Sequence, residues 1–315
     1  MLLRLKHYVS QLKRLLANDG WHGALTTSVK FLIRRKFFLQ FAAETFEYQV
    51  LSRFRPLGST LIELHPTSQK PCMNRWAFYV TYSQNSQIAG YVINQVKALS
   101  ESGYEVLLIS SSPQIPDHEI QKVSPFCRAV LHRQNRGYDF ASWATGYQVA
   151  SENPAWAASL KEAESVILMN DSCFGPYQPL GPILERMRAA RAAVFGISKC
   201  YELGEYIQSY FMHFGSELIK KGVLADYIRR IRILHTKWGI VRFFEIGGSR
   251  WLNSQGFELM ALVDPREPEI AQLLTEFSES DPVRDPVGKA LIERKLSPFH
   301  KRSNSTPPRT AASSN

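Results

Sequence analysis

The sequence predicts an α/β domain built around a mainly parallel, Rossmann-type sheet. Short apolar segments alternate along the chain with stretches whose apolar residues recur at helical spacing. Several of the apolar segments are nearly continuous, as expected for strands with both faces covered by helices. The 315 residues suffice for one large domain with a helical extension.

The expected elements follow in order. Aromatic and β-branched residues fill 76–82 and indicate a first strand. Apolar residues from Ile88 to Leu99 recur at helical spacing and indicate a helix that ends near Gly103. Four further strands are expected over 104–110, 129–132, 165–169 and 192–197. A helical stretch is expected before each of the last two, and the one before 192–197 covers 183–191.

Residues 1–70 are expected to form a basic, amphipathic helical extension and a linker. Residues 1–60 hold ten lysines and arginines against three acidic residues, which accounts for seven of the ten net positive charges. Helical spacing predicts one helix over 5–16, and 25–50 combines aromatic residues with three consecutive basic ones.

This surplus of positive charge favours an anionic partner. Apolar side chains beside basic ones are typical of a helix at a membrane interface, so we expect the extension to bind the inner face of the cell membrane. The alternative is an extension that packs on the main domain and turns a solvated basic face outward. Nucleic acid is not expected as a partner, because charge alone would support it and no nucleic-acid motif is present.

The rest of the chain is expected to divide into the α/β domain over 71–300 and a disordered tail over 301–315. Residues 51–73 are rich in proline, serine and threonine, which is typical of a linker. The last residues consist mainly of serine, threonine, proline, alanine and asparagine without periodicity.

Cysteine spacing and the absence of targeting patterns predict a cytoplasmic protein. The four cysteines lie far apart and form no CxxC pair, which argues against a zinc site or a disulfide framework. The sequence shows no signal-peptide pattern at its start. It also has no apolar run of about 18 residues, which is the length that a membrane-spanning helix needs. A GxxxxGKS or GxxxxGKT loop and a GxGxxG fingerprint are also absent, which disfavours NTPases and dinucleotide enzymes.

Polar loops follow four of the expected strands. In an open parallel sheet the carboxyl ends of the strands share one edge, where loops and helix N-termini bind ligands. The pattern favours a site for a polar, phosphate-bearing ligand, although loops of any α/β domain are polar. The four loops are 83–86, 110–113, 133–139 and 170–172.

Asp171 is the most informative of these polar residues. It follows an apolar strand and precedes a Gly-Pro turn, within the segment Asn170-Asp171-Ser172. A carboxylate at that position can hold a divalent metal against a pyrophosphate and offset the charge that grows on a leaving nucleoside diphosphate. The alternative is that Asp171 caps the following turn.

The loop 133–139 is the second candidate. Gly137 lets the backbone approach a ligand, Arg133 or Arg136 can pair with phosphate, and Asp139 can accept hydrogen bonds from sugar or base groups. Asn135 stands beside them in the same loop. The alternative for Asp139 is an N-cap of the following helix.

Four segments in this order resemble the rhamnan synthesis protein F family of bacterial surface-polysaccharide enzymes. The first two are Asn-Arg-Gly-Tyr-Asp-Phe at 135–140 and the strand and turn at 166–176 that end in Asn-Asp-Ser-Cys-Phe-Gly-Pro. Tyr-Ile-Gln-Ser-Tyr-Phe at 206–211 is similar to the family's His-Leu-Gln-Ser-Tyr-Phe. Phe-Glu-Ile-Gly-Gly-Ser at 244–249 is similar to its Tyr-Glu-Ile-Gly-Leu-Ser. The resemblance covers about two-thirds of the chain.

The resemblance implies a glycosyltransferase with a GT-A-like domain that acts in the assembly of O-antigen, capsule or a rhamnose-containing glycan. It places Asn170-Asp171-Ser172 where many such enzymes carry Asp-x-Asp, so Asp171 becomes the expected catalytic and metal-binding residue for Mg²⁺ or Mn²⁺. The chain has one carboxylate there instead of two. Metal binding would therefore be weaker, or absent with Arg133 and Arg136 supplying positive charge.

The resemblance also implies roles for residues further along. Glu245 is the candidate base that accepts the proton of the acceptor hydroxyl in an inverting transfer, and its alternative is a surface or capping glutamate. Gln208 could bind sugar hydroxyls, or it could be a buried polar residue satisfied by the backbone. His213 could assist phosphate departure, but a lone histidine among aromatic residues is more often structural.

These observations lead to one main hypothesis. The chain is expected to transfer a sugar, such as rhamnose or another deoxyhexose, from a nucleotide-sugar donor to a lipid-linked glycan. Asn135, Arg136, Gly137, Asp139, Asn170 and Ser172, with Arg133 and Gln208, are the expected donor-binding residues. The alternative is a non-catalytic scaffold for glycan assembly that has kept the fold and lost the paired carboxylates.

Overall fold

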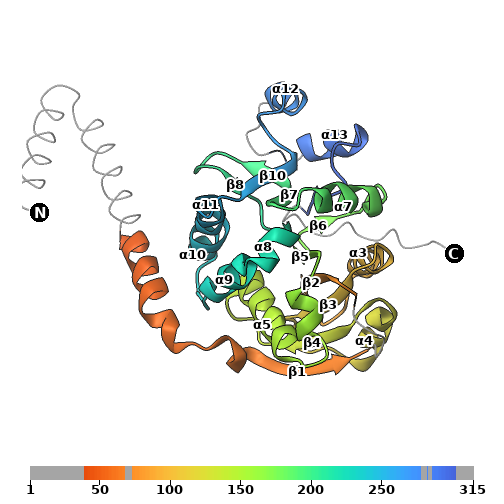
Figure 1. The fold of residues 1–315 in the computed structure, drawn as a ribbon, viewed down its shortest axis with the longest axis vertical. Helices are drawn as coiled ribbons and strands as arrows, with labels where there is room; N and C mark the ends of the chain where they lie inside the picture. Colours follow the sequence, from red (N-terminus) through yellow and green to blue (C-terminus); the bar gives the residue numbers. More distant parts are fainter. Residues whose placement is uncertain (1–38, 68–72, 278–281, 283–285, 303–315) are drawn as a thin grey trace, which may run out of the picture. The chain divides into compact units, whose positions relative to one another are not determined.

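The computed structural model describes residues 39–67, 73–277, 282 and 286–302, and Figure 1 shows the path of the chain. The chain forms two compact units, divided between Phe54 and Arg55. In the first unit, residues 39–49 are helical and a 3₁₀ turn, η1 (Leu51–Phe54), follows. This confirms that the extension expected over 1–70 is helical at 39–49. The helix expected over 5–16 lies outside the described residues.

The second unit contains a nine-stranded sheet in the described part of the chain. The strand order is β1-β4-β3-β2-β5-β9-β7-β10, with β8 beside β7. A separate two-stranded sheet pairs β6 (Cys173–Phe174) with β11 (His300–Lys301). The strands of the large sheet are β1 (Leu61–Pro66), β2 (Arg75–Thr81), β3 (Glu105–Ser110), β4 (Ala129–Arg133), β5 (Ser165–Asn170), β7 (Ala193–Cys200), β8 (Tyr206–Ile207), β9 (Phe211–Gly215) and β10 (Glu258–Val263).

The sheet is mixed and mainly parallel, as the sequence predicts. Strands β4, β3, β2 and β5 are parallel neighbours, and so are β7 and β10. Strand β9 lies antiparallel between β5 and β7, so β7 runs in the same direction as β5. The carboxyl ends of β2, β3, β4, β5, β7 and β10 therefore meet at one edge of the sheet, which is where open α/β sheets bind ligands.

Helices cover both faces of the sheet (Figure 1). Helices α3, α4 and α7 lie on one face, and α5, α8 and α9 on the other. The helices are α3 (Gly90–Glu101), α4 (Asp117–Val123), α5 (Tyr138–Glu152), α6 (Ala157–Lys161), α7 (Leu180–Ala189), α8 (Ser216–Lys220), α9 (Val223–Arg230), α10 (Lys237–Ile240), α11 (Gly247–Ser254), α12 (Pro268–Glu276) and α13 (Val287–Glu293), with a π-helix, η4 (Val241–Ile246), between α10 and α11.

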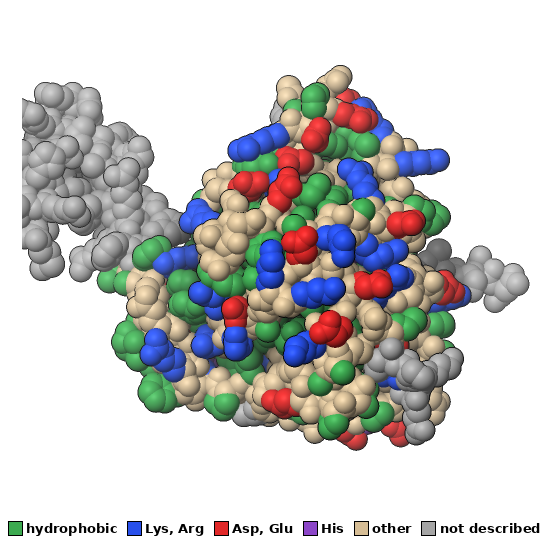
Figure 2. All heavy atoms as spheres, in the orientation of Figure 1, with side chains coloured by type: hydrophobic (Ala, Val, Ile, Leu, Met, Phe, Trp, Pro, Cys, Tyr) green, Lys and Arg blue, Asp and Glu red, His purple; other side chains and the backbone are tan. Residues whose placement is uncertain are grey.

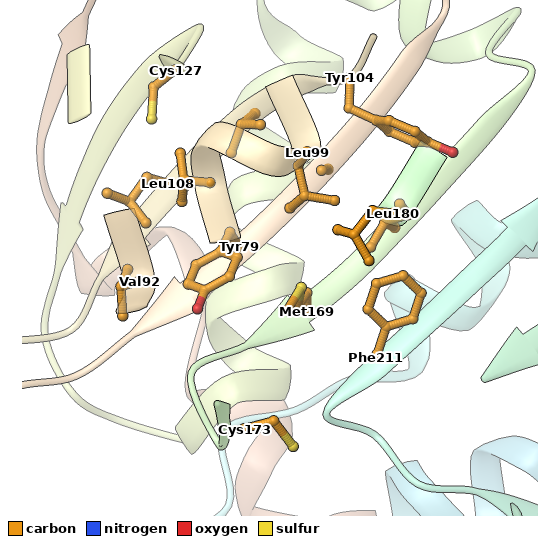
Figure 3. Packing of buried hydrophobic residues seen from close by; sticks show 14 of the residues in the cluster. Tyr79, Val92, Leu99, Tyr104, Leu108, Cys127, Met169, Cys173, Leu180 and Phe211 are labelled. Atoms are coloured by element: carbon orange, nitrogen blue, oxygen red, sulfur yellow. The ribbon is translucent and has the colours of Figure 1, made fainter. Parts of the chain in front are cut away.

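The main core lies under α3 and α7. Figure 3 shows Tyr79 of β2 and Met169 of β5 on the same side as Leu99 of α3 and Leu180 of α7, and all four are buried in one hydrophobic cluster. Such close-packed burial, at about 25 cal/mol per Å² of apolar surface, fixes the backbone of the strands whose ends carry the polar loops.

On the other face, α5 packs directly on the central strands. The Trp143 indole donates a hydrogen bond to the Met169 carbonyl at 3.0 Å, and the rings of Tyr147 and Phe78 lie 5.8 Å apart. This packing holds the amino end of α5, which carries Asp139, at the carboxyl edge of the sheet.

The structure corrects two segment predictions. Residues 51–73 are not a linker throughout, because 61–66 form β1, which pairs antiparallel with β4 at the sheet edge. The segment has mostly exposed side chains and a terminal proline, so its pattern does not resemble that of the buried strands. The expected tail over 301–315 also begins too early, since Lys301 belongs to β11, while 303–315 lie outside the described residues.

Candidate functional site

The residues that the sequence singles out converge at the carboxyl ends of β4 and β5. The Asn170 side chain joins the two predicted segments, because its amide nitrogen donates to Asp139 Oδ2 at 2.7 Å. Its amide oxygen accepts a hydrogen bond from the Ser172 backbone N–H at 3.0 Å. One buried amide thus fixes both the loop after β5 and the first turn of α5.

Asp171 is held by the end of β2. Its Oδ2 accepts hydrogen bonds from the Thr81 hydroxyl at 2.9 Å and from the Tyr82 backbone N–H at 3.1 Å. Burial raises the pKa of the Asp171 carboxyl, and these two bonds offset the rise only in part. Both bonds end on Oδ2, so the local structure orients the carboxylate and does not use it as a simple cap of the following turn.

Asp139 is a second carboxylate in the same place. Burial and the negative charge of Asp171 raise its pKa to about 6, against the lowering effect of the Asn170 hydrogen bond. The helix begins at Tyr138 with Gly137 as its N-cap, so the alternative prediction that Asp139 is the N-cap is wrong. When two carboxylates lie near each other, each makes ionisation of the other less favourable, and a bound cation would offset this repulsion between their charges.

Gly137 is required by the backbone of this loop. Its φ is +80°, and a Cβ there would lie 2.7 Å from Ala141 Cβ and 3.2 Å from Ile233 Cα. Only glycine fits such a close approach in a left-handed conformation. Its neighbours Asn135 and Arg136 are exposed, which is compatible with the predicted contact to a ligand.

The prediction that Arg133 binds phosphate is contradicted by its burial. Its guanidinium is inaccessible to solvent and donates to the Thr60 hydroxyl, the Ser142 hydroxyl and the Arg136 carbonyl. Burial lowers the pKa of Arg133 to about 10. Arg133 therefore acts inside the protein, where it fixes the loop that presents Arg136.

Glu245 is linked to the end of β5 through Ser209 and Tyr210, which precede β9. The Asn170 backbone N–H donates to the Tyr210 carbonyl at 3.1 Å, and the preceding residue, Ser209, donates its backbone N–H to Glu245 Oε2 at 2.9 Å. The Ser209 hydroxyl donates to the same oxygen. Glu245 belongs to the π-helix η4, a distortion that is frequent at functional sites.

Gln208 and His213 have structural surroundings. Gln208 is buried, and its side-chain oxygen accepts a hydrogen bond from Ser198, whose hydroxyl also lies 2.9 Å from the Tyr210 hydroxyl. The burial agrees with the alternative that the sequence left open for Gln208, although the partner seen here is a side-chain hydroxyl and not the backbone. His213 lies inside β9, where burial lowers its pKa to about 3. His213 lies opposite Ile167 and Phe195, inside the strands and not at the carboxyl edge of the sheet.

Sequence reasoning missed Tyr91 and Arg302. The Tyr91 hydroxyl donates to the Asp171 carbonyl at 3.2 Å, and Arg302 donates to that hydroxyl. Tyr91 has the signal of a core residue, since it belongs to the apolar stripe of α3. Arg302 lies in a segment whose composition predicts a tail, so no local pattern could have identified it.

Asp139 and Asp171 are the residues that could hold a metal ion. The described residues contain no group of three or more histidine, cysteine or acidic side chains around one point. A Mg²⁺ or Mn²⁺ ion would be held here by Asp139 and Asp171 and would supply positive charge against a diphosphate. No helix in the described part of the chain is both long and apolar enough to cross a membrane.

A family comparison matches most of this region. Residues 106–304 match the model of a family described as rhamnan synthesis protein F. An uncharacterized protein y4gN of Sinorhizobium fredii is 23% identical over 214 residues, which cover 67% of this chain and 53% of that protein. Virulence protein VirA of Vibrio anguillarum is 20% identical over 211 residues, which cover 65% of each. The chain thus spans about half the length of the first of these relatives.

Two solved structures resemble the fold distantly. The glycosyltransferase GlyE of Streptococcus pneumoniae TIGR4 aligns with 76% of this chain and 57% of its own, with a TM-score of 0.41 and 10% identity. The mannosyltransferase PcManGT of Pyrobaculum calidifontis, solved with GDP-Man and Mn²⁺, aligns with 81% of this chain and 77% of its own, with a TM-score of 0.34 and 10% identity.

Proposed function

We propose that this chain, which belongs to the rhamnan synthesis protein F family, is a glycosyltransferase. It moves a sugar, such as rhamnose or another deoxyhexose, from a nucleotide-sugar donor to a lipid-linked glycan of a surface polysaccharide. One observation carries the proposal: Asn170 joins Asp139 to the strand end that presents Asp171, at the edge where open α/β sheets bind their ligands.

In this proposal the donor diphosphate lies against Asp139 and Asp171. A Mg²⁺ or Mn²⁺ ion bound there would neutralise charge on the diphosphate as it leaves. Asp171 is oriented by Thr81 and Tyr82, and Asp139 by Asn170, so both carboxylates are held before any ligand arrives. Arg136, exposed beside them, supplies a further positive charge for phosphate.

Glu245 is the proposed base. In an inverting transfer the acceptor oxygen attacks the anomeric carbon while the bond from that carbon to the diphosphate oxygen breaks, and a carboxylate takes the acceptor proton. Ser209 fixes Glu245 Oε2 through its backbone N–H and its hydroxyl. Because two donors hold this carboxylate, its position is fixed before the acceptor glycan binds.

We also propose that residues 39–54 bring the enzyme to anionic lipid. Six large apolar side chains in this short segment are at least one-third exposed, and Figure 2 shows hydrophobic side chains gathered over this helix. Arg53 lies among them. Apolar burial together with attraction to anionic headgroups is the usual basis of interfacial binding. The apolar residues are Leu39, Phe41, Phe46, Val50, Leu51 and Phe54.

The test is turnover of sugar nucleotides. The wild-type protein should hydrolyse or transfer from one donor of a panel of UDP-, GDP- and dTDP-sugars, and Asp171→Asn should lose that activity. Asp226→Asn, an exposed aspartate on α9, is the matched control and should keep it. Absence of turnover and of binding across the whole panel would contradict the proposal.

A scaffold without catalysis is the second candidate. It is favoured by the segment Asn170-Asp171-Ser172, in which an amide and a hydroxyl stand at the two outer positions that are carboxylates in Asp-x-Asp. The Asn170 amide is moreover hydrogen-bonded to Asp139 and to the Ser172 backbone. A scaffold predicts that Asp171→Asn leaves glycan synthesis in the cell intact. Loss of the glycan with a normally folded Asp171→Asn protein would exclude it.

A further inference from the structure

Arg302 is placed beside Asp171 by the small sheet. Its backbone N–H donates to the Ser172 carbonyl at 2.7 Å, one residue beyond Asp171. In the antiparallel pairing of β11 with β6, Lys301 lies opposite Cys173. The last described strand is therefore attached directly to the loop that carries the central carboxylate.

The segment leading to Arg302 is anchored in the core. Phe299 is buried, and its ring lies 5.9 Å from that of Phe211 in β9. Gly175 allows this approach, because a Cβ at that position would lie 2.5 Å from the Pro298 carbonyl oxygen. A strand fixed at these points holds Arg302 at a defined place next to the site.

Tyr91 orients the Arg302 side chain. The Tyr91 hydroxyl accepts a hydrogen bond from Arg302 Nη1 and donates its own to the Asp171 carbonyl at 3.2 Å. The ring of Tyr91 is itself fixed by an edge-on contact with Phe174, with ring centroids 5.0 Å apart. The guanidinium thus has a definite position although Arg302 is exposed.

The guanidinium lies near the Asp171 carboxylate without pairing with it. The Tyr91 hydroxyl bridges the guanidinium to the Asp171 backbone carbonyl, and the positive charge of Arg302 lowers the pKa of the Asp171 carboxyl. No ion pair within 4.0 Å joins them among the described residues, and Tyr91 takes the hydrogen bond instead. A planar guanidinium with donors left toward solvent, beside a carboxylate that can hold a metal, matches the requirements of a diphosphate.

We propose that Arg302 binds the diphosphate of the donor and stabilises the leaving nucleoside diphosphate. This role rests on the proposed transferase function. As the acceptor oxygen bonds to the anomeric carbon, the carbon–oxygen bond to the β-phosphate breaks and its electron pair stays on that phosphate. The acceptor proton passes to Glu245. Arg302 meets the added negative charge, which lets the site work with one carboxylate in its Asn-Asp-Ser motif.

Binding measurements on the full chain test this role. The probes are UDP, GDP, dTDP and inorganic pyrophosphate, each with and without Mg²⁺, measured by isothermal titration calorimetry. Arg302→Gln should weaken pyrophosphate and the preferred nucleotide about tenfold or more, because a charge-assisted contact is lost. Arg302→Lys should fall between, since it keeps charge and loses the planar fork. Tyr91→Phe should weaken binding less than Arg302→Gln.

Arg75→Gln is the matched control. Arg75 opens β2, at the opposite edge of the sheet, where it pairs with Glu164 at 2.8 Å, and its loss should leave Kd unchanged. Melting temperatures without ligand check that each variant folds. If the wild type binds and Arg302→Gln binds equally well, the role of Arg302 is overturned while the transferase proposal stands. If the wild type binds none of the probes, both are overturned.

Discussion

Replacing His213 should change how the stability of the protein depends on pH. His213 is inaccessible to solvent within β9, and neither ring nitrogen has a hydrogen-bond partner in the described residues. Burial, with a smaller contribution from Arg188, lowers its pKa from 6.5 to about 3. The native protein therefore holds a neutral imidazole, whereas the unfolded chain takes up a proton below pH 6.5.

The sign and size follow from that difference. A depressed histidine pKa costs no stability above pH 6.5, and below it each pH unit lowers the free energy of unfolding by about 1.4 kcal/mol until pH approaches 3. Going from pH 7.5 to 5.5 should therefore cost the wild type about 1.4 kcal/mol through this residue alone. His213→Gln keeps a polar side chain without titration and should lack this contribution.

The assay is urea denaturation of the wild type and His213→Gln at several pH values between 5 and 7.5. The difference between the two proteins isolates His213 from the carboxyl groups that titrate in both. The reasoning is refuted if the two curves run parallel, because His213 would then be accessible to protons in the native state. Loss of turnover in a stably folded His213→Gln would instead support the role in phosphate departure that the burial argues against.

Three further predictions concern the loop after β4 and the exposed helix. Gly137→Ala should lower the free energy of unfolding by about 2 kcal/mol or more, because the backbone there is left-handed and the new Cβ would lie 2.7 Å from a neighbouring atom. Gly181→Ala in α7, where the added Cβ meets open space, should not destabilise the protein, and urea denaturation of the two variants makes the comparison. Arg133→Met should cost about 3 kcal/mol of stability, because it removes a buried cation that is hydrogen-bonded inside the protein. Arg136→Gln should weaken pyrophosphate binding and change stability by less than about 0.5 kcal/mol. Phe54→Asp should reduce co-sedimentation with vesicles that contain anionic lipid, and equal binding by both proteins would remove residues 39–54 as the lipid-binding surface.

The regular part of the fold could be predicted because its signals are local. Residues 76–82, 104–110 and 165–169 are apolar runs long enough to be buried strands, and their neighbours carry helical spacing. Strand β1 escaped because an edge strand needs no apolar face, and its partner β4 lies more than sixty residues away in the chain. Short strands such as β6 and β11 have no pattern that two residues could reveal.

The site was predictable in part for the same reason. Asp171 stands out as a carboxylate directly after an apolar strand, and Gly137 as a glycine inside a polar loop. What Arg133 does depends on Thr60, 73 residues earlier, whose hydroxyl accepts from its guanidinium inside the protein. Arg302 depends likewise on pairing between segments more than 120 residues apart. The presence of arginines in the polar loop indicates that a cation could bind phosphate, but only the fold decides which arginine is exposed to a ligand.

The central claim is that the carboxyl edge around Asp171 binds a nucleoside diphosphate, and thermal unfolding tests it most directly. Melting curves would be recorded with UDP, GDP and dTDP, each with and without Mg²⁺ or Mn²⁺. One nucleotide at about 100 times its Kd should raise the Tm of the wild type by about 4 to 5 °C, because a ligand that binds only the native state stabilises it by about 2.7 kcal/mol. The same addition should leave the Tm of Asp171→Asn nearly unchanged. A wild-type Tm that stays constant with all three nucleotides, or an equal rise in Asp171→Asn, would contradict the claim.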